Sequence, residues 1–495
     1  MEQQLISVGI DVGTSTTQVI FSRLSMADSG GFFSVPKVDI VSREIIYRGE
    51  IHETPLVSPE LIDSEALAAL VGAEFDRAGF RRGAAGNSGG PYDTGGGRGG
   101  EGRRKVDTGA VIITGESARK ENARAVLEAL SGMAGDFVVS TAGPDLEAVI
   151  AGQGSGAAEW SRRNMSAAVN LDIGGGTTNI AVFVNGEAEA AGSFDIGGRL
   201  VRVREGRIVS VSPGAAEAAG WKGIPLEAGG PADEALLARL CGAMAEILEM
   251  ALNLRPPEPV LEKVRTPGSG RFRLNRKPDG VFLSGGVADA VYETGAEPFA
   301  YGDIGVLLGR ALRQSGLCTR LRLLRGGETI RATVVGAGTY TVSLSGSTIY
   351  YRGAVFPRKN LPVLRLQAGE EGACYRGEDA PLIGKIRWFL AQHDTEFLAI
   401  ALTGVRNPGY GELNAAAGVF ARAAAVLAPA APLVILTERD MAKALGQLVA
   451  ARLSGDRALA ALDSIRAGDH AYIDLGMPLM DGMVVPVVIK TLIFG

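Results

Sequence analysis

The stretch LDIGGGTTNIAVF at residues 171–183 has a near-copy much earlier in the chain, IDVGTSTTQVIF at residues 10–21. In each, an apolar residue, an aspartate, a second apolar residue and a glycine come before a pair of threonines and a β-prone run. The apolar runs on both sides predict two strands joined by a tight turn. One such loop could be an ordinary glycine-rich turn, but two with matched aspartates indicate a duplicated functional feature.

Two common phosphate-binding loops do not match this pattern. A Walker A loop needs Lys followed by Ser or Thr after its glycines, and GGGTTNI at 174–180 has no lysine. A dinucleotide-binding fold needs a helix after its glycines, whereas Asn185-Gly186 between alternating runs predicts a hairpin and therefore strands. Both classes are therefore excluded.

A Gly/Thr turn between two strands can still bind phosphate. Glycines let backbone N–H groups approach a phosphate closely, and threonines add hydroxyl and amide donors. The residues predicted to bind a nucleotide's phosphates are Gly13, Thr14, Ser15, Thr16 and Thr17 in the first loop and Gly174, Gly175, Gly176, Thr177 and Thr178 in the second.

Each loop also carries an aspartate. Asp11 and Asp172 would repel a phosphate at direct contact, so we expect them to act through Mg²⁺ or a water molecule. Two such hairpins facing each other across a cleft would grip one nucleotide from both sides. That arrangement would explain why one chain carries the loop twice.

Composition narrows the class of protein. The chain has 495 residues, a formal net charge of −5, 46% hydrophobic and 21% charged residues, which fits several globular domains. The acidic balance argues against a nucleic-acid partner. Its 3 cysteines are far apart and form neither a disulfide framework nor a zinc-binding spacing. No signal peptide or long apolar stretch is visible, so we expect a cytoplasmic protein with no membrane partner.

A pass along the chain predicts an α/β protein. Outside the two loops, the predicted strands are a pair within 37–51 and single strands at 108–116, 136–143, 280–284, the start of 331–346, 396–404, 432–438, 470–476 and 484–494. The predicted helices are 58–79, 118–132, 144–163, 233–253, 287–292, 411–427 and 439–453. The glycine-dense segment 81–104 is predicted to be a flexible surface insertion, because it cannot bury enough apolar surface to offset the entropy lost on ordering. A phosphate-binding glycine loop is disfavoured there, because no strand leads into the segment and no helix leads out.

The two loops resemble the phosphate 1 and phosphate 2 motifs of the superfamily of actin, hexokinase and seventy-kilodalton heat-shock chaperones. FLSGGVADAV at 282–291 is similar to its adenosine motif, which implies that Ser284, Gly285 and Gly286 lie near the base and ribose. The segments 141–157 and 334–344 fall where its two connecting segments belong. The resemblance implies a two-lobed actin-like ATPase fold of duplicated ribonuclease H-like domains, with lobes at 1–165 and 166–350 and an additional C-terminal α/β unit at 360–495.

A closer resemblance is to the reactivating factors of ethanolamine ammonia-lyase. It rests on TGAVIITGESARKENA (108–123), AGPDLEAVIAG (142–152), LDIGGGTTNIAVF, YGDIG (301–305) and YIDLGMPLMDGMVVPVVIKTL (472–492). It implies that the chain uses ATP and Mg²⁺ to release damaged cobalamin from that lyase, its partner, so that adenosylcobalamin can rebind. Cobalamin would be the cofactor of the lyase. Oligomeric state and association with an ethanolamine-utilization microcompartment are left open, and the C-terminal unit is the predicted region of target specificity.

The superfamily also implies roles for the acidic residues. Asp11 would hold Mg²⁺ or its waters, and Asp172 would hold the metal, orient the attacking water or act as a base. Asp145 and Glu147 lie in the first connecting segment, where the superfamily often has a catalytic acid, although acidic residues also favour the start of a helix. Glu116, which follows a predicted strand, could likewise be either a catalytic acid or a structural residue.

Other candidates are weaker. Gly197 and Gly198 follow a strand and either lie over the phosphates or form a plain turn. Arg119 and Lys120 follow TGES and fit a solvated helix face better than a phosphate site. His52, His393 and His470 are too scattered to predict a catalytic triad or a histidine metal site.

Three rival functions remain at this point. A small-molecule kinase of the same superfamily would need a carboxylate base aimed at a substrate hydroxyl. An actin-like filament or scaffold protein would need a self-complementary surface. An activator ATPase with an iron–sulfur cluster is disfavoured by the scattered cysteines.

Overall fold

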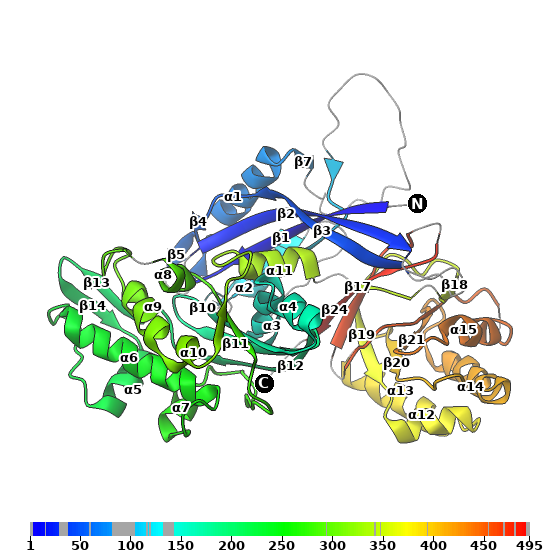
Figure 1. The fold of residues 1–495 in the computed structure, drawn as a ribbon. Coiled ribbons are helices and arrows are strands. Elements are labelled where there is room, and N and C mark those ends of the chain that lie inside the picture. Colours follow the sequence, from blue (N-terminus) through cyan, green and yellow to red (C-terminus); the bar gives the residue numbers. More distant parts are fainter. Residues whose placement is uncertain are drawn as a thin grey trace.

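The computed structural model describes residues 3–14, 16–28, 38–58, 61–81, 104–114, 117, 120–131, 143–293, 295–340, 343–346, 348–393, 395–453, 455–468, 471–479 and 482–491. The strand predicted at 136–143 and nearly all of the glycine-dense segment 81–104 lie outside these residues. Figure 1 shows three bodies, each built around one larger sheet. The predicted α/β fold class, with two related lobes and a C-terminal unit, is confirmed.

The first sheet has the strand order β3-β2-β1-β9, with the short β4 beside β2. β1 runs antiparallel to β2 and parallel to β9. The segment predicted as a strand pair is one long strand, β3, followed by β4. The bounds are β1 (Gln3–Val12), β2 (Thr16–Asp28), β3 (Val38–Arg48), β4 (His52–Glu53) and β9 (Thr108–Ile113).

Two helices cover one face of this sheet, α1 (Ser64–Arg77) and α2 (Ala123–Ser131). Val8 and Ile10 of β1 and Phe21 of β2 point into this layer, where the Phe21 ring meets the Phe75 ring edge-on at 4.9 Å. α1 begins later than predicted because Asp63 caps it, accepting a 3.0 Å hydrogen bond from the Ala66 amide.

The second sheet also has five strands and repeats the arrangement, in the order β12-β11-β10-β15-β16. β10 runs antiparallel to β11 and parallel to β15, as β1 does to β2 and β9. The predicted hairpin is confirmed, with φ of 53° at Asn185 and 89° at Gly186. The bounds are β10 (Ala167–Ile173), β11 (Thr178–Val184), β12 (Glu187–Phe194), β15 (Gly280–Ser284) and β16 (Arg322–Leu324).

Helices α5, α6, α8 and α9 supply most of the helical residues in the core that covers one face of the second sheet. α6 confirms the long amphipathic helix predicted from the sequence, and its N-cap is Asp233. The helices are α5 (Pro213–Lys222), α6 (Glu234–Ala251), α7 (Pro259–Lys263), α8 (Ala288–Tyr292), α9 (Gly305–Gln314) and α10 (Gly316–Thr319). The minor strands of both lobes are β5 (Leu56–Ser58), β6 (Leu61–Ile62), β7 (Phe80–Arg81), β8 (Arg104–Lys105), β13 (Val201–Arg204) and β14 (Arg207–Val211).

Two helices pack against each other between the sheets, α3 (Pro144–Gly154) and α11 (Ala332–Tyr340). α3 packs on the second sheet, whereas α11 comes after that sheet in the chain and packs on β1 and β2 of the first. They pack very closely, since a Cβ at Gly154 would lie 1.8 Å from the Ala332 carbonyl oxygen and one at Gly336 would lie 2.0 Å from that of Ile150. The second sheet is therefore covered by α3, which comes before it in the chain. The first sheet is covered by α11, which comes after the second sheet in the chain.

Two predictions about these segments are wrong. The start of 331–346 is helical, although Val334 and Val335 favour a strand locally, because its small residues permit the close packing on α3. The helix predicted at 144–163 is two helices, α3 and α4 (Ala157–Asn164), separated at Gly156 with φ of 94°.

The C-terminal unit has an eight-stranded sheet in the order β17-β24-β23-β19-β20-β21-β22-β18. Strands β19 to β22 are parallel, and their nearly continuous apolar runs are buried on both faces. The strands are β17 (Ser343–Leu344), β18 (Tyr350–Arg352), β19 (Arg358–Arg365), β20 (Ala399–Leu402), β21 (Leu433–Thr437), β22 (Leu459–Leu462), β23 (Ala471–Leu475) and β24 (Pro486–Thr491).

The helices of this unit lie together on one face of the sheet, as Figure 1 shows. They are α12 (Ala368–Tyr375), α13 (Ala380–His393), α14 (Tyr410–Ala423) with the short 3-10 helix η2 (Ala424–Val426), and α15 (Ala442–Ala450). The strands and helices predicted here are confirmed, but β17 and β18 come before residue 360. The three domain boundaries themselves stay predictions.

The C-terminal unit packs against the junction of the lobes. Val488 of β24 lies in one small core with Ile112 of β9, Ile150 of α3 and Ala337 of α11. Within the ranges described, no helix combines the length and apolarity needed to cross a membrane.

Candidate functional site

The two glycine-threonine loops fold into the same turn. The Gly13 amide donates a 2.9 Å hydrogen bond to the Thr16 carbonyl oxygen, and the Gly174 amide donates one of 2.9 Å to that of Thr177. The turns connect β1 to β2 and β10 to β11, at equivalent corners of the two sheets. The likeness seen in the sequence is therefore a likeness of backbone geometry.

Each turn is preceded by an aspartate that receives a hydroxyl hydrogen bond from the parallel neighbour strand. Thr114, which follows β9, donates to Asp11 Oδ1 at 3.0 Å. Ser284, the last residue of β15, donates to Asp172 Oδ1 at 2.6 Å, and Thr333 donates to Asp172 Oδ2 at 3.4 Å. These hydroxyls fix the orientation of both carboxylates.

Both aspartates are buried, and their charges interact. Burial raises the pKa of Asp11 to about 7; the hydrogen bond from Thr114 opposes this and the charge of Asp172 adds to it. Burial also raises the pKa of Asp172, opposed by the hydrogen bonds from Ser284 and Thr333. Among the described residues, no Lys or Arg forms an ion pair with either. Two buried carboxylates that lack a cation are a donor set that fits Mg²⁺.

Four of the predicted glycines fall into two groups. A Cβ at Gly197 would lie 2.4 Å from the Gly175 carbonyl oxygen, and one at Gly285, where φ is 84°, would lie 2.4 Å from that of Ile173. These two glycines are required for backbone packing. A Cβ at Gly176 or Gly286 would meet nothing within 4 Å, so open space lies in front of both.

The predicted threonines also divide. Thr17 and Thr178 are fully buried, and their hydroxyls contact Thr54 Oγ1 at 3.1 Å and the Ile196 carbonyl oxygen at 2.7 Å. Both therefore stabilise the turns through buried hydrogen bonds. Thr16 and Thr177 are half-buried at the turns themselves, and Thr14 is half-buried beside them.

The sequence reasoning missed a cation at the second loop, Arg199. Its amide donates a 2.7 Å hydrogen bond to the Gly175 carbonyl oxygen, and its side chain lies against Gly175. Its Nε lies 3.4 Å from Oδ2 of Asp303, whose other oxygen accepts the Gly305 amide at 2.8 Å. The signal was present, since Arg199 directly follows Gly197-Gly198 and Asp303 lies in the YGDIG stretch.

Two further residues hold the first loop and were also missed. The Thr54 and Ser117 hydroxyls both donate to the Gly13 carbonyl oxygen, at 2.8 Å and 3.0 Å. Gly198 has the matching role at the second loop, where its amide donates a 3.0 Å hydrogen bond to the Gly174 carbonyl oxygen. Neither hydroxyl stood out in the sequence, because each comes from a segment distant from the loop.

The acids of the first connecting segment lie at the start of α3. Asp145 Oδ1 accepts a 2.6 Å hydrogen bond from the Ser269 hydroxyl, and its Oδ2 accepts one of 2.9 Å from the Gly270 amide. The oxygens of Asp145 are therefore held by the segment 269–270. Glu147, two residues after Asp145, is buried. Ser15, Glu116, Arg119 and His470 lie outside the described residues.

One histidine does lie in an acidic cluster. Ligand atoms of Glu50, His52 and Glu74 lie within 4.8 Å of one another. Arg77 Nη1 already lies 2.5 Å from Glu74 Oε1 and 3.4 Å from Glu50 Oε2, so the cluster has its own cation. We therefore interpret it as structural.

Comparison with known proteins matches nearly the whole chain. The family model described as "Ethanolamine utilisation protein EutA" matches residues 3–89 and 99–495. The chain is 36% identical over 508 residues to the ethanolamine ammonia-lyase reactivase EutA of Salmonella typhimurium, and 34% identical over 502 residues to that of Escherichia coli. Each alignment covers 99% of both proteins.

Solved structures are more distant. EutJ from Carboxydothermus hydrogenoformans is 18% identical, with a TM-score of 0.30, and the match covers 68% of this chain and 89% of that one. A ROK hexokinase from Thermus thermophilus is 16% identical, with a TM-score of 0.31, over 68% of this chain and 97% of that one.

Proposed function

The chain belongs to the EutA family of ethanolamine utilisation proteins, and from this we propose that it is an ATP-dependent reactivase of ethanolamine ammonia-lyase. The observation that carries the proposal is the match, at 36% and 34% identity, to two curated reactivases over 99% of each chain. The match includes the C-terminal unit as well as the two lobes.

We propose that ATP binds with its phosphates between the two turns. The open space in front of Gly176 supports this, because a phosphate oxygen can there approach the backbone amides directly. Arg199, beside Gly175, supplies a positive charge next to the same turn. Ser284 and Gly286 would lie toward the adenosine, as the resemblance of 282–291 implies.

Asp11 and Asp172 would hold Mg²⁺, directly or through its waters. When bound, this ion would neutralise charge on the phosphates. Thr114 and Ser284 keep the two carboxylates oriented by donating to one oxygen of each. Asp172, fixed at both oxygens by Ser284 and Thr333, is the better placed to orient a water for attack.

Nucleotide binding would be coupled to the positions of the lobes. A ligand gripped by both turns favours the closed arrangement only by the difference in its affinity for the closed and open forms. α3 and α11 cross between the sheets, and Val488 of the C-terminal unit packs where they meet. Lobe closure would therefore move the C-terminal unit, the proposed region of contact with the lyase, and so promote release of damaged cobalamin.

The test uses ethanolamine ammonia-lyase blocked with an inactive cobalamin. The protein, Mg²⁺-ATP and free adenosylcobalamin are added, and the return of ammonia release is measured. We expect recovery that needs ATP and is lost in Asp11→Asn and Asp172→Asn. ATP hydrolysis with no recovery of the lyase would reject the reactivase and favour a kinase or a filament protein.

A further inference from the structure

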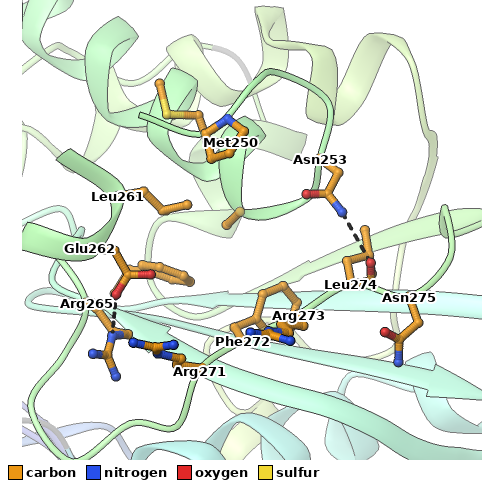
Figure 2. A pocket seen from close by; sticks show the side chains of 13 residues that line it. Met250, Asn253, Leu261, Glu262, Arg265, Arg271, Phe272, Arg273, Leu274 and Asn275 are labelled. Atoms are coloured by element: carbon orange, nitrogen blue, oxygen red, sulfur yellow. Dashed lines mark hydrogen bonds and ion pairs between the residues drawn. The ribbon is translucent and has the colours of Figure 1, made fainter. Parts of the chain in front are cut away.

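A pocket of about 580 Å³ lies in the second lobe, formed by residues other than those of the two turns. Its walls come from the C-terminal end of α6, from α7 and from the segment 271–275, and it reaches the end of β12 at Phe194 (Figure 2). This volume is within the range of sites that bind small molecules.

The floor of the pocket is apolar and held in place. Phe194 and Met250 are buried, and the Phe272 ring meets the Phe194 ring edge-on at 6.5 Å. A Cβ at Gly192 would lie 2.6 Å from Cβ of Phe272, so β12 has room for this ring only because residue 192 is glycine. Leu261 of α7 completes the apolar surface.

The rim is positively charged. Arg265, Arg271 and Arg273 all line the pocket, and Figure 2 shows their side chains along the same wall. Arg265 lies 3.2 Å from Glu262. Within the described part of the chain, neither Arg271 nor Arg273 has a carboxylate partner. Three arginines against one glutamate, in a chain of net charge −5, make this a local concentration of positive charge.

The wall that carries these arginines is anchored at several points. The Asn253 side chain donates a 3.2 Å hydrogen bond to the Leu274 carbonyl oxygen. Arg265 Nη1 donates a 2.9 Å hydrogen bond to that of Ser269, and Gly270 donates to Asp145. The rim is therefore attached to the folded lobe on both sides of Arg271.

We propose that this pocket binds a small organic anion with an apolar or aromatic body. Guanidinium groups match the oxygens of a carboxylate, sulfonate or phosphate and can form paired hydrogen bonds with them. The apolar part would lie over Phe272, Met250 and Leu261. The site is separate from the proposed nucleotide site, and the inference does not rest on the proposed function.

The test titrates the full-length protein with anilinonaphthalene sulfonate, a fluorescent anion of this class, in the presence of Mg²⁺-ADP. We expect saturable binding that is weakened about tenfold or more, or about 1.4 kcal/mol, in the double variant Arg271→Ser/Arg273→Ser. The matched control is Arg276→Ser/Lys277→Ser, which removes the same charge from the same segment outside the pocket. It should change the affinity less than about twofold.

Further arms separate the alternatives. Leu261→Trp, which fills the apolar floor, should also weaken binding. Equal losses in the two charge variants, or equal affinity for neutral N-phenylnaphthylamine, would overturn the proposal, because either would show binding without this anion site. Displacement of the probe by a polyglutamate peptide at a lower concentration than by an aromatic carboxylate would also overturn it, in favour of an acidic protein segment.

Discussion

The hydroxyl of Ser284 donates a 2.6 Å hydrogen bond to Oδ1 of Asp172 across the parallel strands β15 and β10. In the other lobe, Thr114, which follows β9, donates to Asp11. The register differs, since Asp172 pairs with Ser284 itself whereas Asp11 pairs with Ile112, two residues before Thr114. Each lobe therefore orients its carboxylate with a hydroxyl, but from a different position. Each hydroxyl lies in a segment far along the chain from the aspartate to which it donates.

Replacing these hydroxyls should impair catalysis more than folding. In Ser284→Ala, Asp172 keeps only the longer hydrogen bond from Thr333, and a hydrogen bond to a charged group contributes roughly 1.5–3 kcal/mol. We expect kcat for the proposed ATP hydrolysis to fall about tenfold, with a smaller change in KM. Thr114→Val should act in the same direction through Asp11. Unchanged kcat in both variants would mean that the orientation of the carboxylates does not limit hydrolysis.

The carboxyl group of Glu74 should make the stability of the fold depend on pH. Burial alone would raise its pKa, but hydrogen bonds from His52 and Tyr47 and the charge of Arg77 outweigh burial and lower it from 4.5. Because the pKa is lower in the folded state, the ionised carboxylate stabilises the fold above the unfolded pKa. That stabilisation is lost as the pH falls through the folded pKa.

The measurement compares thermal unfolding of the wild type and Glu74→Gln over a range of pH. The difference in Tm should be large near neutral pH and should shrink as the pH falls below 4.5 and through the lowered pKa of the folded state. Glu65→Gln, an exposed change on the same helix, is the control and should show little effect at any pH. A difference in Tm for Glu74→Gln that does not vary with pH would contradict the argument.

Asp145 should prove structural. Asn at this position keeps one acceptor but presents an NH₂ group to the Ser269 or Gly270 donor. We expect a loss of about 1–3 kcal/mol in the free energy of unfolding, with kcat unchanged within about twofold. Ser269→Ala should give a similar loss, and the double variant should lose less than the sum of the two. A large fall in kcat at unchanged stability would instead support the catalytic role considered from the sequence.

The sequence predicted the paired turns and the α/β architecture because those depend on local patterns. Gly13 and Gly174 come just before threonines and β-prone runs, and a turn between strands is decided within a few residues. The hairpin at Asn185-Gly186 is equally local. The C-terminal strands followed from short apolar runs bounded by turn residues.

The failures come from contacts between distant segments. The helix at Val334–Val335 depends on α3, which is far earlier in the chain, and local β propensity gives the opposite answer. Thr54 was missed for the same reason. Its closeness to the first turn is set by a tertiary hydrogen bond to the Gly13 carbonyl oxygen, which no spacing in the sequence indicates. Arg199 is a different case, because its position directly after Gly197-Gly198 was visible in the sequence.

The glycines of the second loop allow a direct test of where the phosphates bind. A Cβ at Gly176 would meet no protein atom within 4 Å, so Gly176→Ala should fold with an almost unchanged Tm. If the phosphates of ATP lie against this turn, the same methyl group would keep them from the backbone amides, and ATP affinity should fall at least about tenfold. Gly220→Ala, at a helix position with equally open surroundings, is the matched control and should leave affinity unchanged. Isothermal titration with Mg²⁺-ATP would measure both. Normal affinity in Gly176→Ala would place the phosphates elsewhere and remove the main support for a nucleotide held between the two turns.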